Sequence, residues 1–163
     1  MEYSDTLIAV VEVAIAFAGF SGIVSVFGRR SASEWSLGDR HRLSNLLRAS
    51  FIALFVAFFA LLLLGAGLPE RRTWAISSAV WALCWLVLAG NSFYRTTAAI
   101  RSGEVPARAM YLRVMLVASV AFTLLQVANA VYLQTFWAFL SGLLFALAVA
   151  ASQFVRLLYA PRQ

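Results

Sequence analysis

Long apolar segments alternate with short polar segments along this chain. Five runs are rich in Leu, Ile, Val, Ala and Phe, and they cover about 6–27, 44–66, 74–95, 110–132 and 135–157. A helix needs about 20 apolar residues to cross a hydrocarbon core of roughly 30 Å, so each run can span a bilayer. Backbone polar groups inside a bilayer must pair within their own segment, which favours helices. The pattern predicts an all-α polytopic membrane protein, with residues 1–163 forming one domain of five transmembrane helices.

The ends of the runs carry turn and cap signals. Ser36 and Asp39 have the spacing of a capping box, which predicts that the second helix begins near Leu37, ahead of its apolar run. The last two runs are separated by very few residues, and the segment 135–137 is typical of a tight hairpin turn. The first run follows an acidic start and is too long for a typical signal peptide, so we expect a retained span.

Composition supports this class and narrows the function. The chain is 63% hydrophobic and 12% charged, which leaves no room for a separate soluble domain. The net charge of +6 does not indicate nucleic-acid binding, because the arginines lie in short loops between apolar runs. With one His, one Cys and no Lys, the sequence offers no metal site, cofactor site or catalytic dyad. We therefore do not expect an enzyme.

The arginines also predict an orientation. Counting the edges of the runs, ten of the thirteen basic residues lie in the segments after runs one, three and five, only Arg71 and Arg72 lie on the other side, and Arg48 falls inside run two. The positive-inside rule then places the N-terminus outside and the C-terminus in the cytoplasm. All basic residues are Arg, which favours a GC-rich bacterial genome and hence the bacterial inner membrane. Arg29, Arg30 and Arg48 are candidates for contact with anionic lipid head groups, and Arg48 either snorkels to them or forms an inner charge ring.

Glu12 is the only acidic residue inside the apolar runs. A carboxylate near the bilayer centre costs roughly 2.5–3.5 kcal/mol on insertion scales, so a functional role is the first hypothesis. Glu12 lies about six residues below the outer end of its run, which is roughly 9 Å along a helix. Ser119, Thr123 and Gln126 form a polar stripe at a similar depth in run four. We expect Glu12 to pack against Gln126 or Thr123, either in an ion or proton pathway or as a neutral hydrogen-bonded pair.

Small residues line two opposite faces of the first run. Glu12, Ala16, Gly19 and Ile23 share one face at helical spacing, and Ala14, Ala18, Ser21 and Ser25 share the other. Small side chains let helices approach closely, so Ala16, Gly19 and Gly22 are assigned to a packing or pore face. The double pattern predicts that this helix is central, surrounded by other helices of the chain or by copies of itself.

Three further stripes favour packing or lipid contact. They are an aromatic stripe of Phe51, Phe55, Phe58 and Phe59 in run two, another of Trp74, Trp81 and Trp85 in run three, and a small stripe of Gly142, Ala146, Ala150 and Gln153 in run five. The phenylalanines would serve as a hydrophobic gate only if run two lined a pore.

The neighbourhood of Glu12 resembles two groups of transporters and channels in a limited way. Val11-Glu12-Val13 is similar to the first helix of the small multidrug resistance transporters, where a glutamate carries the proton and the cationic substrate. This chain departs from them in having five predicted spans rather than four and the opposite N-terminus. An outer carboxylate with inner arginines also resembles, in reversed chain order, the layout of store-operated calcium channels.

These observations leave two functional hypotheses. The first is a small homo-oligomeric channel or transporter for cations or protons, with Glu12 on a central first helix. The second is a non-catalytic membrane scaffold or accessory subunit whose polar residues only pack helices together. The expected partners are the lipid bilayer, further copies of the chain and anionic lipid head groups, without nucleic acid.

Overall fold

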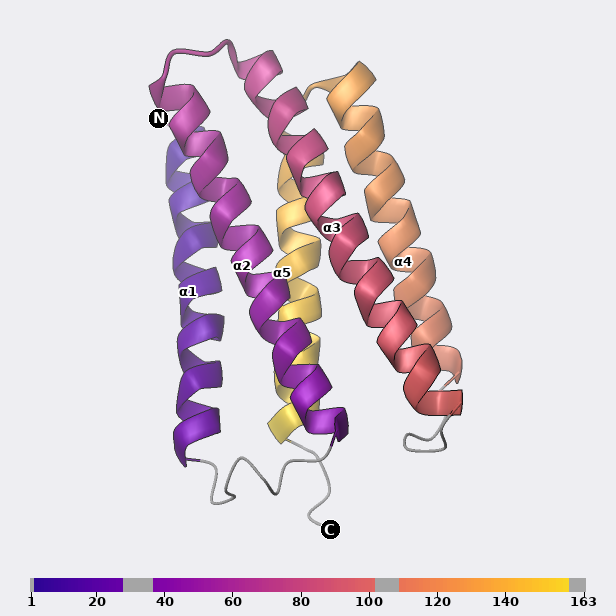
Figure 1. The fold of residues 1–163 in the computed structure, drawn as a ribbon. Helices are drawn as coiled ribbons and strands as arrows, with labels where there is room; N and C mark the ends of the chain where they lie inside the picture. Colours follow the sequence, from indigo (N-terminus) through magenta and orange to yellow (C-terminus); the bar gives the residue numbers. More distant parts are fainter. Residues whose placement is uncertain (1, 28–36, 102–108, 159–163) are drawn as a thin grey trace.

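The protein is a bundle of five long helices that reverse direction in turn, so its termini lie at opposite ends (Figure 1). The structure is a computed structural model that describes residues 2–27, 37–101 and 109–158. The helices are α1 (Glu2–Phe27), α2 (Leu37–Gly65), α3 (Glu70–Arg101), α4 (Ala109–Ala128) and α5 (Phe136–Leu158), and a short π-helix (Asn129–Leu133) continues α4. All five are long and apolar enough to cross a membrane. The predicted all-helical membrane class and its five spanning helices are confirmed, as is the start of α2 at Leu37.

Helix α5 occupies the centre of the bundle. It packs against the other four helices, and its contact with α2 is the most extensive in the molecule. Helix α1 packs against α2 and α5, and Figure 1 shows α1 and α4 on opposite sides of the bundle. The expectation that the first helix is surrounded by other helices of its own chain is therefore wrong. A helix at the edge of the bundle buries only one of its two small faces.

Small side chains hold the central helices close together. Helix α2 turns Ala49, Ala53 and Ala57 inward, and none of the three is exposed. On α5, the whole predicted small stripe from Gly142 to Gln153 is buried. Short side chains on facing helices let the two backbones approach closely and add van der Waals contact, the main source of helix association in lipid. The predicted packing role of the α5 stripe is confirmed.

The turn between α2 and α3 has a defined chemistry. Leu68 N–H donates to the Leu63 carbonyl at 3.1 Å, and Gly67 N–H donates to the Leu64 carbonyl at 3.0 Å. Gly67 has φ of 78°, so these two bonds form a Schellman motif with glycine at the left-handed position. The carbonyl of Pro69 then accepts hydrogen bonds from the N–H groups of Arg72 and Thr73 as α3 begins. The turn thus pairs the backbone groups that both helix ends expose.

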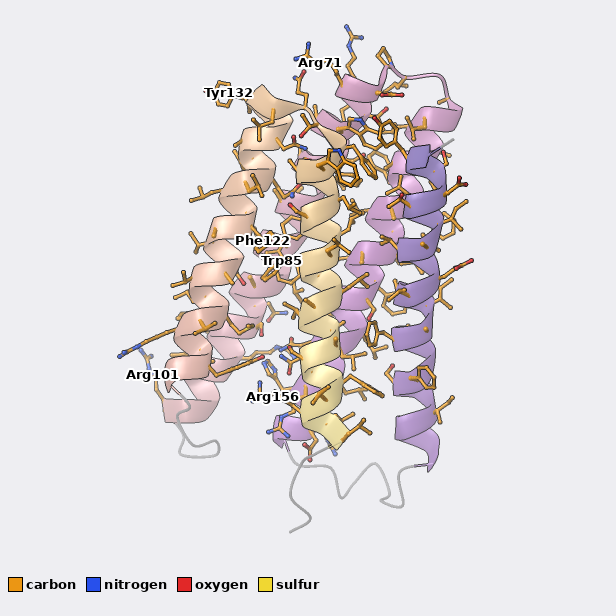
Figure 2. All side chains as sticks on the ribbon, turned by 180° about the vertical axis from the view of Figure 1, so that it is seen from behind. Arg71, Trp85, Arg101, Phe122, Tyr132 and Arg156 are labelled. Carbon is orange, nitrogen blue, oxygen red and sulfur yellow. The ribbon has the colours of Figure 1, made fainter. Side chains whose placement is uncertain are left out.

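Aromatic side chains divide between the core and the outer surface. Trp74, Trp81 and Trp85 on α3 are buried, and Trp81 and Trp85 stack with ring centroids 5.2 Å apart. Figure 2 shows Trp85 and Phe122 in the same layer of the bundle, and the Phe145 ring contacts both of theirs. The phenylalanine stripe of α2 instead lies outside, with Phe55 and Phe58 at least half exposed. The tryptophans therefore pack helices together, whereas the exposed phenylalanines present a lipid-facing surface.

Candidate functional site

The two small faces of α1 have different surroundings. Ala14 is completely buried, Ser21 is 1% exposed, and the Ser21 hydroxyl donates to the Ala18 carbonyl at 2.6 Å. Leu7 and Val10 extend this buried face toward the start of the helix. The face opposite Glu12 therefore makes the contact with α2 and α5.

The other small face, which carries Glu12, is open. Glu12, Ala16 and Gly19 are all exposed, and Ile23 on the same stripe is 52% exposed. A Cβ added at Gly19 or Gly22 would meet no atom within 4 Å. Within the described part of the chain, the Glu12 carboxylate has no hydrogen-bond or ion-pair partner. The structure thus places a carboxyl group on an uncovered, narrow face of a membrane-spanning helix.

The expected contact between Glu12 and run four is wrong within a single chain. Gln126 is fully buried and donates through Nε2 to the Ala138 carbonyl at 2.6 Å, which ties α4 to α5. Thr123 is 8% exposed, and its hydroxyl donates to the Ser119 carbonyl of its own helix at 2.7 Å. The polar stripe of α4 faces the interior of the bundle, whereas Glu12 faces away from it. A helical wheel gives the direction of each side chain but not the identity of the neighbouring helix.

Asn129 organises the hairpin between α4 and α5. Its Oδ1 accepts the Thr135 N–H at 2.9 Å, and its Nδ2 donates to the Thr135 carbonyl at 3.1 Å and to the Ser78 hydroxyl at 2.8 Å. Asn129 also opens the π-helical turn, which ends at Gln134 with φ of 52°. The fully buried Asn129 therefore fixes the predicted hairpin and links it to α3. An asparagine next to a predicted turn was the sequence signal for this role.

Gln126 and Asn129 are buried polar side chains that we call the polar seam, and Gly142 on α5 lies against Gln126. A Cβ on Gly142 would lie 2.6 Å from Nε2 of Gln126 and 3.2 Å from Cε2 of Trp81. The glycine thus makes room for the hydrogen bond that Gln126 donates to Ala138. Gln126 therefore lies beside Ala138 and Gly142 of α5, and Thr123 bonds to the Ser119 carbonyl within α4.

A second polar region lies at the opposite end of the bundle from Arg71. The side chains of His41, Asn45, Arg48, Ser92, Arg95 and Arg156 are grouped here, and we call this set the basic cluster. Asn45 Nδ2 donates to the Ser92 hydroxyl at 3.0 Å, and that hydroxyl lies 3.4 Å from His41 Nε2. The three guanidinium groups lie within electrostatic range of the His41 ring. Figure 2 shows Arg156 at the same end of the bundle as Arg101, away from Arg71.

Neutral groups hold the arginines of this cluster in place. The Arg156 guanidinium lies over the Tyr111 ring, 4.1 Å from its centroid, and Gln153 donates to the Tyr111 hydroxyl at 2.9 Å. Arg95 donates through Nε to Asn91 Oδ1 at 3.1 Å. Of the arginines proposed for lipid contact, Arg48 lies here, half-buried, and Arg29 and Arg30 lie outside the described residues.

The described residues contain no group of three His, Cys, Asp or Glu side chains close enough to hold a metal ion. No protein-family model matches the sequence, and neither a curated protein nor a solved structure shows significant similarity to it. The two features of the structure that bear on function are the exposed Glu12 face of α1 and the basic cluster.

Proposed function

We propose that this protein is a homo-oligomeric membrane channel or small transporter for cations or protons. In the assembly, the Glu12 face of α1 meets the same face on neighbouring copies. The observation that carries the proposal is the exposed, unpartnered carboxylate of Glu12 on a spanning helix. Leaving this group in lipid costs roughly 2.5–3.5 kcal/mol, and a water-lined axis between copies removes that cost.

The neighbours of Glu12 support a contact between copies. Ala16 and Gly19 continue the exposed Glu12 face with small residues, and the space beside Gly19 and Gly22 is open, although the larger Ile8 and Ile15 flank the carboxylate. Helices that carry small residues on one face approach each other closely in membranes. Copies of α1 around an axis would bring their Glu12 carboxylates into a ring, and such rings select cations.

In this assembly the polar residues of α4 have a structural role and do not contact the ion. Gln126 and Thr123 are buried in the bundle, where Gln126 donates to the Ala138 carbonyl and Thr123 donates to the Ser119 carbonyl. Their role in the proposal is to fix the bundle behind α1, so the ion pathway depends on Glu12. The Ala14 face of α1 anchors the helix to its own bundle.

The proposed setting is the bacterial cytoplasmic membrane with the N-terminus outside. Among the described residues, Arg71 and Arg72 start α3 at one end, whereas Arg95, Arg101 and Arg156 lie at or near the other. This distribution supports a cytoplasmic location for the second end, because basic loops are retained there. Glu12 then lies near the middle of the span Tyr3–Ile23, slightly closer to its outer end.

A second candidate function is that of a non-catalytic accessory subunit or scaffold. The observation that favours it is the open space beside Gly19 and Gly22, which also suits a helix from a different membrane protein. In that case a polar or basic group of the partner would pair with Glu12, and the purified chain alone would conduct nothing.

Ion flux through reconstituted liposomes tests the proposal. We expect liposomes containing the purified protein to dissipate a cation or proton gradient, and Glu12→Gln to lower that flux at least tenfold because the ring loses its charge. Glu70→Gln is the matched control, since Glu70 is exposed at the start of α3 and lies outside the α1 face.

Two results would remove the channel hypothesis. The first is wild-type flux no greater than that of protein-free liposomes. The second is equal flux for wild type and Glu12→Gln when both proteins insert to the same extent. The first result, together with a monomeric purified chain, would leave the accessory-subunit function in its place.

A further inference from the structure

The basic cluster concentrates positive charge at one end of the bundle. Arg48 comes from α2, Arg95 from α3 and Arg156 from α5, so three helices bring guanidinium groups toward one ring, that of His41. Asp39 at the start of α2 pairs with Arg42 at 2.9 Å, and among the described residues no acidic side chain pairs with Arg48, Arg95 or Arg156. Like charges repel, and this arrangement persists most easily when an anion lies among them.

The hydrogen bonds around the cluster leave donors available. Arg95 uses only Nε, in its bond to Asn91, which leaves its terminal N–H groups for another acceptor. The Tyr111 ring supports Arg156 from one side through a cation–π contact that occupies no N–H group. A guanidinium group presents pairs of N–H donors in a planar fork, the geometry that suits the oxygens of a phosphate group.

The depth of the cluster matches the head-group region of a bilayer. The apolar spans of α2, α3, α4 and α5 begin or end at Gly38, Arg95, Tyr111 and Leu158. His41 and Arg156 each lie within three residues of such a span end. The neutral members Asn45 and Ser92 hydrogen-bond directly across α2 and α3, so the cluster lies on the helices themselves rather than on a charged loop. Basic pockets between spanning helices bind the head groups of anionic lipids.

We propose that the basic cluster is a binding site for a phosphate group, supplied by the head group of an anionic phospholipid. Arg95 and Arg156 donate to the phosphate oxygens from two helices, and Arg48 adds charge from a third. The hydrogen bond between Asn45 and Ser92 holds α2 and α3 together beside these arginines. The site lies near one end of the helices, whereas Glu12 lies near the middle of its span, and occupancy of the site does not require ion flux.

Lipid binding to the full-length purified chain tests the site. The probes are dioleoyl phosphatidylglycerol and dioleoyl phosphatidylcholine, with dissociation constants measured by native mass spectrometry. We expect the anionic lipid to bind more tightly than the zwitterionic one. The double variant Arg95→Gln/Arg156→Gln should weaken anionic-lipid binding on the order of 30-fold, from about fivefold for each arginine.

A matched double variant separates a site from general charge attraction. Arg101→Gln/Arg113→Gln removes the same charge from the same end of the bundle, at two exposed positions outside the cluster. We expect this control to weaken binding no more than about threefold in total, as expected for screened surface charges. If the cluster double variant does not keep its helical circular dichroism, Arg156→Gln alone is measured, with an expected fivefold loss.

Three results would overturn the proposal. One is an equal loss of binding in the two double variants, which would mean attraction by net charge alone. Another is equal affinity for the two lipids in the wild-type protein. The third is displacement of the anionic lipid by millimolar inorganic phosphate, which would make soluble phosphate rather than lipid the ligand of the same arginines.

Discussion

Helices α1 and α5 carry the same sequence pattern with opposite surroundings. Both have small residues at helical spacing around one polar side chain, Glu12 in α1 and Gln153 in α5. The α5 stripe is completely buried, and its Gly142 lies against Gln126 and Trp81. The Glu12 face of α1 is exposed, and Gly19 has no neighbouring atom within 4 Å of an added Cβ. A small-residue stripe therefore marks a helix contact, which is satisfied inside the chain for α5 and remains open for α1.

Replacing Gly142 of α5 and Gly19 of α1 by leucine should give the largest difference in stability between the two faces. Gly142→Leu forces a side chain into the space of Gln126 and Trp81 and displaces the hydrogen bond to Ala138. We expect the free energy of unfolding to fall by about 1–3 kcal/mol through overpacking. Gly19→Leu, the matched control, should change it by no more than about 0.5 kcal/mol in detergent-solubilised monomers. Denaturation in mixed detergent micelles measures both, and equal losses would show that the two faces are packed alike.

The polar seam beside the α5 stripe should give an intermediate effect. Asn129→Ala removes the bonds to Ser78 and to both backbone groups of Thr135, all at 2.8–3.1 Å. We expect a loss of about 1–2 kcal/mol, since buried polar groups lose their partners but such bonds are modest within membranes. Ser119→Ala on α4 is the control, because the backbone carbonyl rather than the side chain of Ser119 accepts the bond from Thr123. If Asn129→Ala were as stable as Ser119→Ala, Asn129 would not stabilise the hairpin.

Sequence patterns predicted the features that depend on length and periodicity. Helical spacing grouped the tryptophans of α3 and the phenylalanines of α2 into stripes but left packing and lipid contact open for both, and only the tryptophan stripe is buried. The five helices able to span a membrane and the start of α2 at Leu37 follow from apolar runs and a cap signal. These features are local, so neighbouring helices do not change them.

The features that sequence patterns missed depend on which helices become neighbours. The wheel of α1 identified two small faces but gave no means to decide that the Ala14 face packs inside and the Glu12 face remains open. It also did not reveal that α5, rather than α1, occupies the centre. The basic cluster joins residues from α2, α3 and α5 that are up to 115 positions apart, such as His41 and Arg156, and spacing along the chain carries no signal for it.

Disulfide cross-linking in native membranes tests most directly whether the open face of α1 meets a second copy. In a Cys84→Ser background, Gly19→Cys places a thiol on the Glu12 face, and Leu124→Cys places one on exposed α4 at the other side of the bundle. We expect Gly19→Cys to form a covalent dimer under mild oxidation and Leu124→Cys to stay monomeric. Failure of Gly19→Cys to cross-link, or equal cross-linking of both variants, would contradict the contact between copies at Glu12.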